Sequence, residues 1–190
     1  MVDSRLWITA AAPLAGQLHK GLSELSPRAQ VNLRGNNEDP MFVKAVLATI
    51  GLKLPAVPNK VVTGDKIKAL WLSPDEWLVV GDAPTQKDLV AALESELSGQ
   101  HVAINDVSAN RTIFALTGAD SHKVLMKSCD MDFHPRVFGP GDCAQTLIAK
   151  SPAIVEQVTK TDFHVYVRGS LGRYVCEWLN DALGEYVIQP

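Results

Sequence analysis

The sequence is poor in the features that mark disulfide-stapled domains, zinc ribbons and nucleic-acid-binding proteins. Its 190 residues include only three cysteines, Cys129, Cys143 and Cys176, and no CxxC pair, which excludes a zinc ribbon and a redox dithiol. So few cysteines, odd in number, are typical of a reducing compartment, and we expect a cytoplasmic protein. The 18 basic and 21 acidic residues give a net charge of −3 without long basic runs, which argues against nucleic acid as a partner.

Enzyme motifs and membrane segments are missing as well. The sequence contains no GxGxxG, GxxxxGK[ST], HExxH or GxSxG motif. No stretch approaches the ~18 consecutive apolar residues that a membrane-spanning helix needs, and the first apolar stretch lacks the basic run of a signal peptide. Because 46% of the residues are apolar and 21% charged, the composition is that of an ordinary globular protein. We therefore expect a folded module that neither spans nor binds a membrane.

The residues that are present predict two halves with one shared order of elements. Alternating apolar residues and helical spacing give strand, helix, two strands, helix, strand in each half, which is the split β-α-β order of ferredoxin-like units. The predicted fold class is α+β, with mixed or antiparallel sheets and helices packed on one face. The expected elements are strands 29–34, 67–72, 77–80, 102–107, 111–116, 144–149, 153–158, 163–167 and 185–188, and helices 40–50, 85–98, 119–128 and 170–183.

The same patterns suggest a domain organisation. Residues 28–190 are expected to form one compact domain of two pseudo-repeated halves, about 28–108 and 109–190. Residues 1–27 have weak periodicity but are too apolar for a free tail, so we interpret them as an N-terminal arm that docks on something. Residues 52–65, which contain two prolines and a glycine, are expected to be a long crossing loop.

The densest polar cluster precedes a strand of the second half. Asp130, Asp132 and His134 would project to one side of an extended chain, as metal ligands do, and Cys143 follows nine residues later. The alternative is a solvated loop between helix and strand, and we favour it because metal ligands usually have tighter spacing. A nucleophilic pair of Cys143 and His134 lacks a third orienting group. We therefore predict no catalytic residue and no metal site.

A polar turn and a few large side chains are candidates for recognition. Residues 106–111 interrupt two apolar strands, and Arg111 could hold a carboxylate there, although a tight turn satisfied by its own side chains is the simpler interpretation. Two tryptophans flank the Pro74 turn, and indoles beside a turn are commonly core or interface anchors. The candidates for a partner interface are Trp7, Trp71, Trp77 and Arg28.

Several stretches, taken together, resemble one known family along residues 25–183. They are SPRAQVNLR (26–34), LWLSPDEWLVVG (70–81), DVSANR (106–111), HPR (134–136), CAQT (143–146), FHVYVR (163–168) and WL (178–179). In this order and at this chain length they resemble the gamma subunit of heterotetrameric sarcosine oxidase.

The resemblance implies a non-catalytic structural or assembly subunit of a four-chain enzyme. That enzyme oxidatively demethylates sarcosine to glycine and passes the one-carbon unit to tetrahydrofolate. The partners implied are the alpha, beta and delta subunits. The resemblance also implies that FAD, FMN, NAD, zinc and tetrahydrofolate lie on those other subunits, with no cofactor on this chain.

The family is also similar in fold to the folate-binding module of the glycine-cleavage aminomethyltransferase. In that enzyme an Asp-Asp pair follows a short apolar strand, and the matching place here holds Glu156 and Gln157. Glu156, with Arg111 or Arg168 nearby, is therefore a weak folate-binding candidate. The alternative function is accordingly a stand-alone folate-binding module similar to the aminomethyltransferase.

Overall fold

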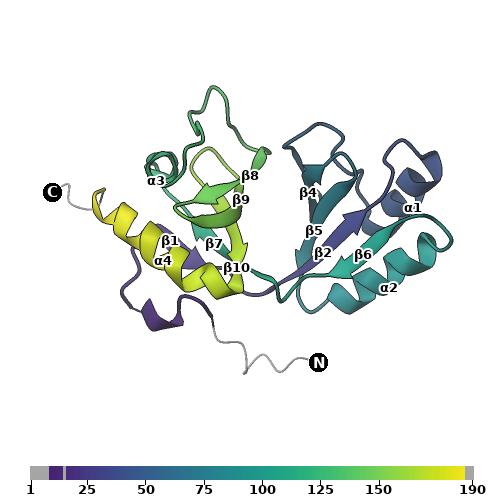
Figure 1. Ribbon diagram of the computed structural model, residues 1–190, viewed down its shortest axis with the longest axis horizontal. Coiled ribbons are helices and arrows are strands. Elements are labelled where there is room, and N and C mark those ends of the chain that lie inside the picture. Colours follow the sequence, from purple (N-terminus) through teal and green to yellow (C-terminus); the bar gives the residue numbers. More distant parts are fainter. Residues whose placement is uncertain (1–8, 15, 187–190) are drawn as a thin grey trace. The chain divides into compact units, whose positions relative to one another are not determined.

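The structure, a computed structural model, describes residues 9–14 and 16–186. These residues form two compact units, each with a five-stranded sheet and its own helices (Figure 1). The middle unit comprises residues 27–109 and 141–144, and the terminal unit comprises the rest of the described chain. Strand pairs in both sheets are antiparallel. The predicted α+β class with two ferredoxin-like sheets is confirmed.

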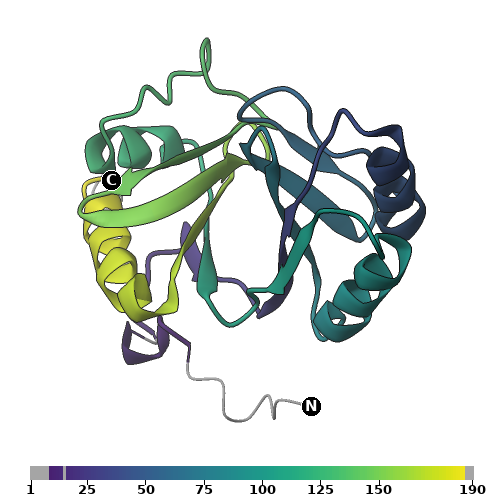
Figure 2. The same ribbon diagram turned by 45° about the vertical axis from the view of Figure 1, so that its right-hand side comes forward.

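The middle unit has the split β-α-β order that its sequence predicts. Its sheet has the order β3-β4-β5-β2-β6, and its two helices cover the same face of that sheet (Figure 2). The elements are β2 (Arg28–Arg34), α1 (Pro40–Ile50), β3 (Val61–Thr63), β4 (Ile67–Ser73), β5 (Glu76–Asp82), α2 (Gln86–Glu96) and β6 (Ala103–Asp106).

Helix α1 begins and ends where its capping residues predict. The Asp39 carboxylate accepts a hydrogen bond of 2.9 Å from the N–H of Met41, and Pro40 occupies the first helical position, where no N–H is needed. Gly51 ends the helix with a φ of 72°, a left-handed conformation that favours glycine, and its N–H donates to the Leu47 carbonyl. Local chemistry alone therefore sets the bounds of this helix.

One strand of the middle unit lies in a segment predicted to be a loop. Strand β3 falls within residues 52–65 and pairs with β4, with Val61 opposite Leu70. The Val61 N–H also donates to the Gly141 carbonyl at 2.8 Å, which holds the strand on its other side. Three residues are too few to display an alternating pattern, so hydrophobic periodicity does not identify this strand.

The terminal unit has a sheet of order β1-β7-β10-β9-β8. Helices α3 and α4 lie on one face of it (Figure 2). The elements are β1 (Leu22–Glu24), β7 (Arg111–Leu116), α3 (Ser121–Ser128), β8 (Cys143–Ile148), β9 (Ser151–Gln157), β10 (Phe163–Arg168) and α4 (Gly169–Gly184), preceded by the short 3-10 helix η2 (Ala12–Leu14). Helix α4 is the longest element described.

The two sheets share one topology, but their last positions are filled from different parts of the chain. In order, β3-β4-β5-β2-β6 corresponds to β8-β9-β10-β7-β1. Strand β6 follows α2 along the chain, whereas its counterpart β1 comes from the N-terminal segment. The predicted closing strand 185–188 is wrong where it is described, because residues 185–186 form a turn; residues 187–188 lie outside the described part.

The N-terminal segment, predicted as a docking arm, completes the chain's own sheet. Leu22 of β1 lies opposite Leu116 of β7 and is 3% exposed. The Glu24 carboxylate accepts hydrogen bonds from the N–H groups of Ala10 (3.1 Å) and Ala11 (2.8 Å) and from the Thr112 hydroxyl. Strand β1, together with Ala10 and Ala11, is therefore bound within the terminal unit.

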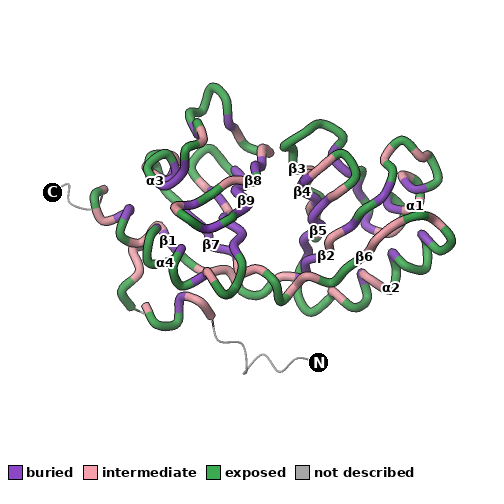
Figure 3. The backbone as a smooth tube through the Cα atoms, in the orientation of Figure 1, coloured by how far each residue is buried: buried purple, intermediate pink, exposed green. Residues whose placement is uncertain are grey.

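The apolar core of the middle unit lies between its sheet and its helices. Buried backbone concentrates on the strands, while the outer faces of the helices are exposed (Figure 3). The core residues are Val31, Leu33, Phe42, Val46, Ile50, Leu52, Leu54, Ala69, Trp77, Val79, Leu89, Leu93 and Leu97. Among the helices of residues 9–14 and 16–186, none has the length and apolar character needed to cross a bilayer.

Candidate functional site

Glu156 lies in a buried polar group on one face of the terminal sheet. It is 3% exposed on β9, directly opposite His164 of β10. Its Oε2 accepts a hydrogen bond of 2.6 Å from the hydroxyl of Tyr166 and lies 3.5 Å from His164 Nδ1. Because a buried carboxylate needs hydrogen-bond donors, Tyr166 and His164 serve here as internal partners of Glu156.

Arg111 does not join that group. It is the first residue of β7, and its register partner on β10 is Arg168. The β7 residue nearest to Glu156 is Ala115, which lies opposite His164, so Arg111 is four residues away, or about 13 Å along the strand. The two folate candidates of the sequence are therefore placed at different ends of the sheet.

The polar cluster before β8 is a set of turns. Asp132 Oδ1 accepts the N–H of His134 at 2.8 Å, and His134 Nδ1 accepts the N–H of Arg136 at 3.2 Å. These contacts use the atoms that would ligate a metal to hold the local backbone. Within the described residues, no group of three His, Cys, Asp or Glu side chains is placed to hold a metal ion.

The three thiols are buried and free of disulfides. Cys143 is 1% exposed, and its Sγ lies 3.6 Å from the carbonyl oxygens of both Lys60 and Trp71. The Cys129 sulfur lies 3.0 Å from the Thr146 hydroxyl. Burial raises the pKa of the Cys176 thiol to about 11, so that group stays protonated near neutral pH and is a poor nucleophile.

Residues 106–111 form a tight turn that is held by its own side chains, which is the simpler of the two interpretations. Asp106 Oδ1 accepts hydrogen bonds from the N–H (2.9 Å) and the hydroxyl (2.5 Å) of Ser108. The same Ser108 hydroxyl oxygen accepts the N–H of Gln30 on β2 at 3.0 Å. Asp106 and Ser108 therefore fasten the end of β6 to its own sheet.

The interface candidates have different surroundings in the structure. Trp77 is fully buried, 6.0 Å from Phe42 between ring centroids, and its Nε1–H donates to the Pro55 carbonyl at 2.9 Å. The prediction that Trp77 is an interface anchor is therefore wrong, because its indole fills the core of the middle unit.

The other interface candidates are less buried or lie outside the described residues. Trp71 is partly buried against the same core. Arg28 forms an ion pair with Asp82, its strand partner, and Trp7 lies outside the described residues.

Sequence reasoning missed an aromatic pair on the surface of the terminal unit. Tyr174 and Trp178 of α4 are 37% and 40% exposed, with ring centroids 6.3 Å apart. Both lie within the helix predicted over residues 170–183. Val175 and Leu179 are buried, and each aromatic residue directly precedes one of them in the sequence. Successive residues of a helix are about 100° apart, so the two aromatic side chains lie beside the buried stripe and not within it.

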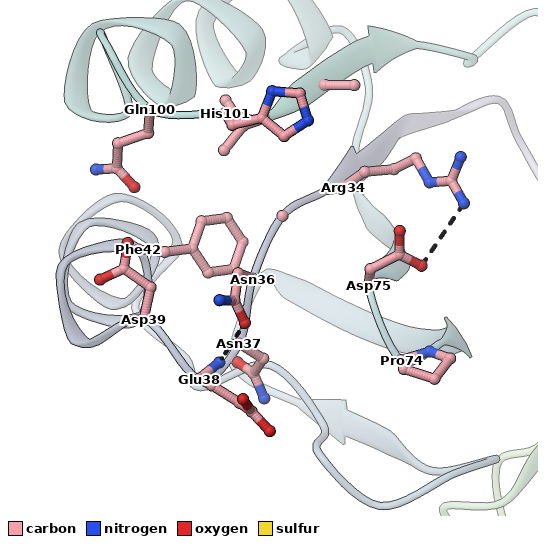
Figure 4. A pocket seen from close by; sticks show the side chains of 13 residues that line it. Arg34, Asn36, Asn37, Glu38, Asp39, Phe42, Pro74, Asp75, Gln100 and His101 are labelled. Carbon is pink, nitrogen blue, oxygen red and sulfur yellow. Dashed lines mark hydrogen bonds and ion pairs between the residues drawn. The ribbon is translucent and has the colours of Figure 1, made fainter.

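A cleft of about 830 Å³ opens at one end of the middle unit (Figure 4). The end of β2, the N-terminal turn of α1, the β4–β5 turn and the segment before β6 surround it. Its lining residues are Arg34, Gly35, Asn36, Asn37, Glu38, Asp39, Phe42, Pro74, Asp75, Gln100, His101, Val102 and Ala103. Nothing in the sequence pattern identifies this cleft, because its walls come from four separate segments.

Comparison with known proteins identifies the family. Residues 34–185 match the sarcosine oxidase, gamma subunit family. The sarcosine oxidase subunit gamma of Corynebacterium sp. strain P-1 is 32% identical over 171 residues, which cover 89% of this chain and 82% of that protein. The chain belongs to the sarcosine oxidase gamma subunit family.

A solved structure extends the match to the fold. A chain of the heterotetrameric sarcosine oxidase from Corynebacterium sp. U-96 superposes with a TM-score of 0.86 and 29% identity, covering 97% of this chain and 98% of that chain. The aminomethyltransferase T of the glycine cleavage system from Bartonella henselae has a TM-score of 0.61 at 16% identity, covering 91% of this chain and 48% of that chain. At that identity the second likeness concerns the fold alone.

The residues of this gamma subunit family member do not fit a folate site at Glu156. The carboxylate is nearly inaccessible, and its Oε2 is already bonded to the Tyr166 hydroxyl. A pterin ring would have to displace that hydroxyl and leave a buried donor unpaired, which costs about 1–3 kcal/mol. The fold is thus shared with aminomethyltransferase T, while the acidic position in this chain has an internal structural role.

Proposed function

We propose that this chain is the gamma subunit of a heterotetrameric sarcosine oxidase and serves there as a non-catalytic assembly subunit. The complex would oxidatively demethylate sarcosine to glycine, with tetrahydrofolate accepting the one-carbon unit. The partners would be its alpha, beta and delta subunits. FAD, FMN, NAD, zinc and tetrahydrofolate would be bound by those subunits.

The observation that carries this proposal is the correspondence along the whole chain with one subunit of the Corynebacterium oxidase. Likeness over 97% of this chain and 98% of that chain supports an equivalent place in an equivalent assembly. Family membership by sequence supports the same conclusion independently.

The chemistry of the candidate residues supports a role without catalysis. Glu156 is bonded to Tyr166, His134 binds the backbone of its own turn, and the thiol of Cys143 lies against two carbonyl oxygens. Each of these groups stabilises the fold of its surroundings. A general base or nucleophile must be able to reach a substrate, and Glu156 and Cys143 are buried.

Titration with tetrahydrofolate tests the assignment against the alternative of a stand-alone folate-binding module. We expect the isolated chain to show no saturable binding by calorimetry at micromolar concentrations, because Glu156 is closed off by its own partners. The Glu156→Ala variant should behave in the same way. Micromolar binding by the wild type that is lost in Glu156→Ala would contradict the proposal and favour the alternative.

A further inference from the structure

The cleft of the middle unit is lined by more acidic than basic side chains. Three of its lining residues are acidic, Glu38, Asp39 and Asp75, and Arg34 is the one lysine or arginine among them. The Arg34 guanidinium is already shared between Asp75 at 3.6 Å and Glu76 at 3.3 Å. The cleft therefore presents an excess of negative charge.

Two hydrogen-bond acceptors in the cleft, Gln100 Oε1 and the Glu38 carboxylate, accept no hydrogen bond from the described residues. The Gln100 Oε1 atom is buried and has no hydrogen-bond partner, and its side chain extends toward Phe42 and Asp39 in Figure 4. Within the described part of the chain, no hydrogen bond or ion pair engages the Glu38 carboxylate. Buried acceptors are normally satisfied, so Gln100 needs a donor from another molecule, either water or a ligand.

The walls of the cleft are preformed. Asn36 Oδ1 accepts the N–H of Glu38 at 2.9 Å, and the Gly35 N–H donates to the Asp75 carbonyl at 3.0 Å. A Cβ atom at Gly35 would lie 2.3 Å from the ring of Phe42, so glycine is needed for the two walls to meet. The Ser73 hydroxyl, which donates to Asp75, and then Arg34 lower the pKa of that carboxyl, which stays ionised near neutral pH.

We propose that this acidic cleft receives a lysine or arginine side chain from a partner subunit. The inference rests on the proposed function, which supplies the partner. A cationic side chain provides the N–H donors that Gln100 and Glu38 can accept, and its methylenes can lie along apolar lining such as Pro74 and Val102. The acidic groups are spread over separate loops of an open cleft, an arrangement that suits a side chain delivered on a polypeptide better than a small free amine.

Two variants with matched controls test the proposal in the assembled complex. Glu38→Lys reverses an exposed charge in the cleft, and Glu94→Lys does the same on the exposed face of α2, outside the lining. Gln100→Leu removes the unpaired acceptor, and Gln86→Leu removes another buried, unpaired Oε1 at the start of α2. Each variant is co-expressed with a differently tagged wild-type copy and the partner genes, so that both copies compete for the same partners.

We expect Glu38→Lys and Gln100→Leu to be depleted at least about tenfold relative to wild type in the partner-bound fraction. Both controls should compete within about twofold. The free variants should melt as the wild type does, because the Glu38 carboxylate and the Gln100 Oε1 atom, which the substitutions remove, accept no hydrogen bond from the described residues.

Equal competition by the cleft variants, with wild type bound to its partners, would overturn the cleft proposal alone. If the wild type recruits no flavin-bearing chain, the proposed function fails instead. Depletion of the two controls to the same extent as the cleft variants would show a general loss of fold and would also overturn the assignment to the cleft.

Discussion

Replacing Trp77 with alanine is expected to lower the free energy of unfolding by about 3–5 kcal/mol. The indole is fully buried between the sheet and helices of the middle unit, so its loss leaves a cavity that closely packed neighbours such as Phe42 can fill only in part. The substitution also leaves the Pro55 carbonyl without the Nε1–H that it accepts at 2.9 Å. Urea denaturation followed by far-UV circular dichroism measures the change.

Trp71 provides the matched control, since it is the register partner of Trp77 on β4. It is only partly buried, so Trp71→Ala should cost about 1–2 kcal/mol. If Trp77 were a surface anchor for a partner, Trp77→Ala would leave the isolated chain as stable as the wild type. Equal and small effects of the two substitutions would therefore contradict the buried position of Trp77.

Deleting residues 1–26 is expected to unfold most of the terminal unit. The deletion removes β1, whose Leu22 is 3% exposed, and the three hydrogen bonds that Glu24 accepts. Losing the leucine costs about 2–5 kcal/mol and losing the charged hydrogen bonds about 1.5–3 kcal/mol more, which approaches the whole stability of a typical domain. The freed edge of β7 should also promote aggregation.

Hydrogen exchange read by mass spectrometry locates this effect. Exchange in β7 and β10 should accelerate strongly in the deletion variant, while β2 and β5 of the middle unit should change much less. Within the full chain, Leu22→Ala should destabilise, and Ser23→Ala, at the exposed neighbouring position, should not. A deletion variant that melts like the wild type and keeps β7 protected would contradict this role of the N-terminal segment.

Most of the fold follows from local signals in the sequence. The alternation at Ala29, Val31 and Leu33 marks β2, and all three side chains are fully buried. Asp39 and Gly51 bound α1 because capping chemistry is local. Strands β1 and β3 escaped prediction because each has only three residues, too few for an alternating pattern. Strand β1 also depends on β7, a partner far along the chain.

The candidate site was less predictable than the fold. Glu156 was found through a resemblance, yet the tyrosine that engages it lies ten residues away on the next strand, and register alone brings them together. Trp77 and Trp71 have similar sequence surroundings. Which of them is buried depends on the pairing of their strands and on the packing of α1, whose Phe42 lies against Trp77. The cleft draws on four separate segments, so no single stretch of sequence could indicate it.

Co-purification tests the central claim most directly. The tagged chain is expressed from its native operon, and the material bound to it is examined by mass spectrometry and visible absorption. The account predicts flavin-coloured material that contains larger amine-oxidising chains. A colourless monomer that binds tetrahydrofolate with micromolar affinity would contradict it.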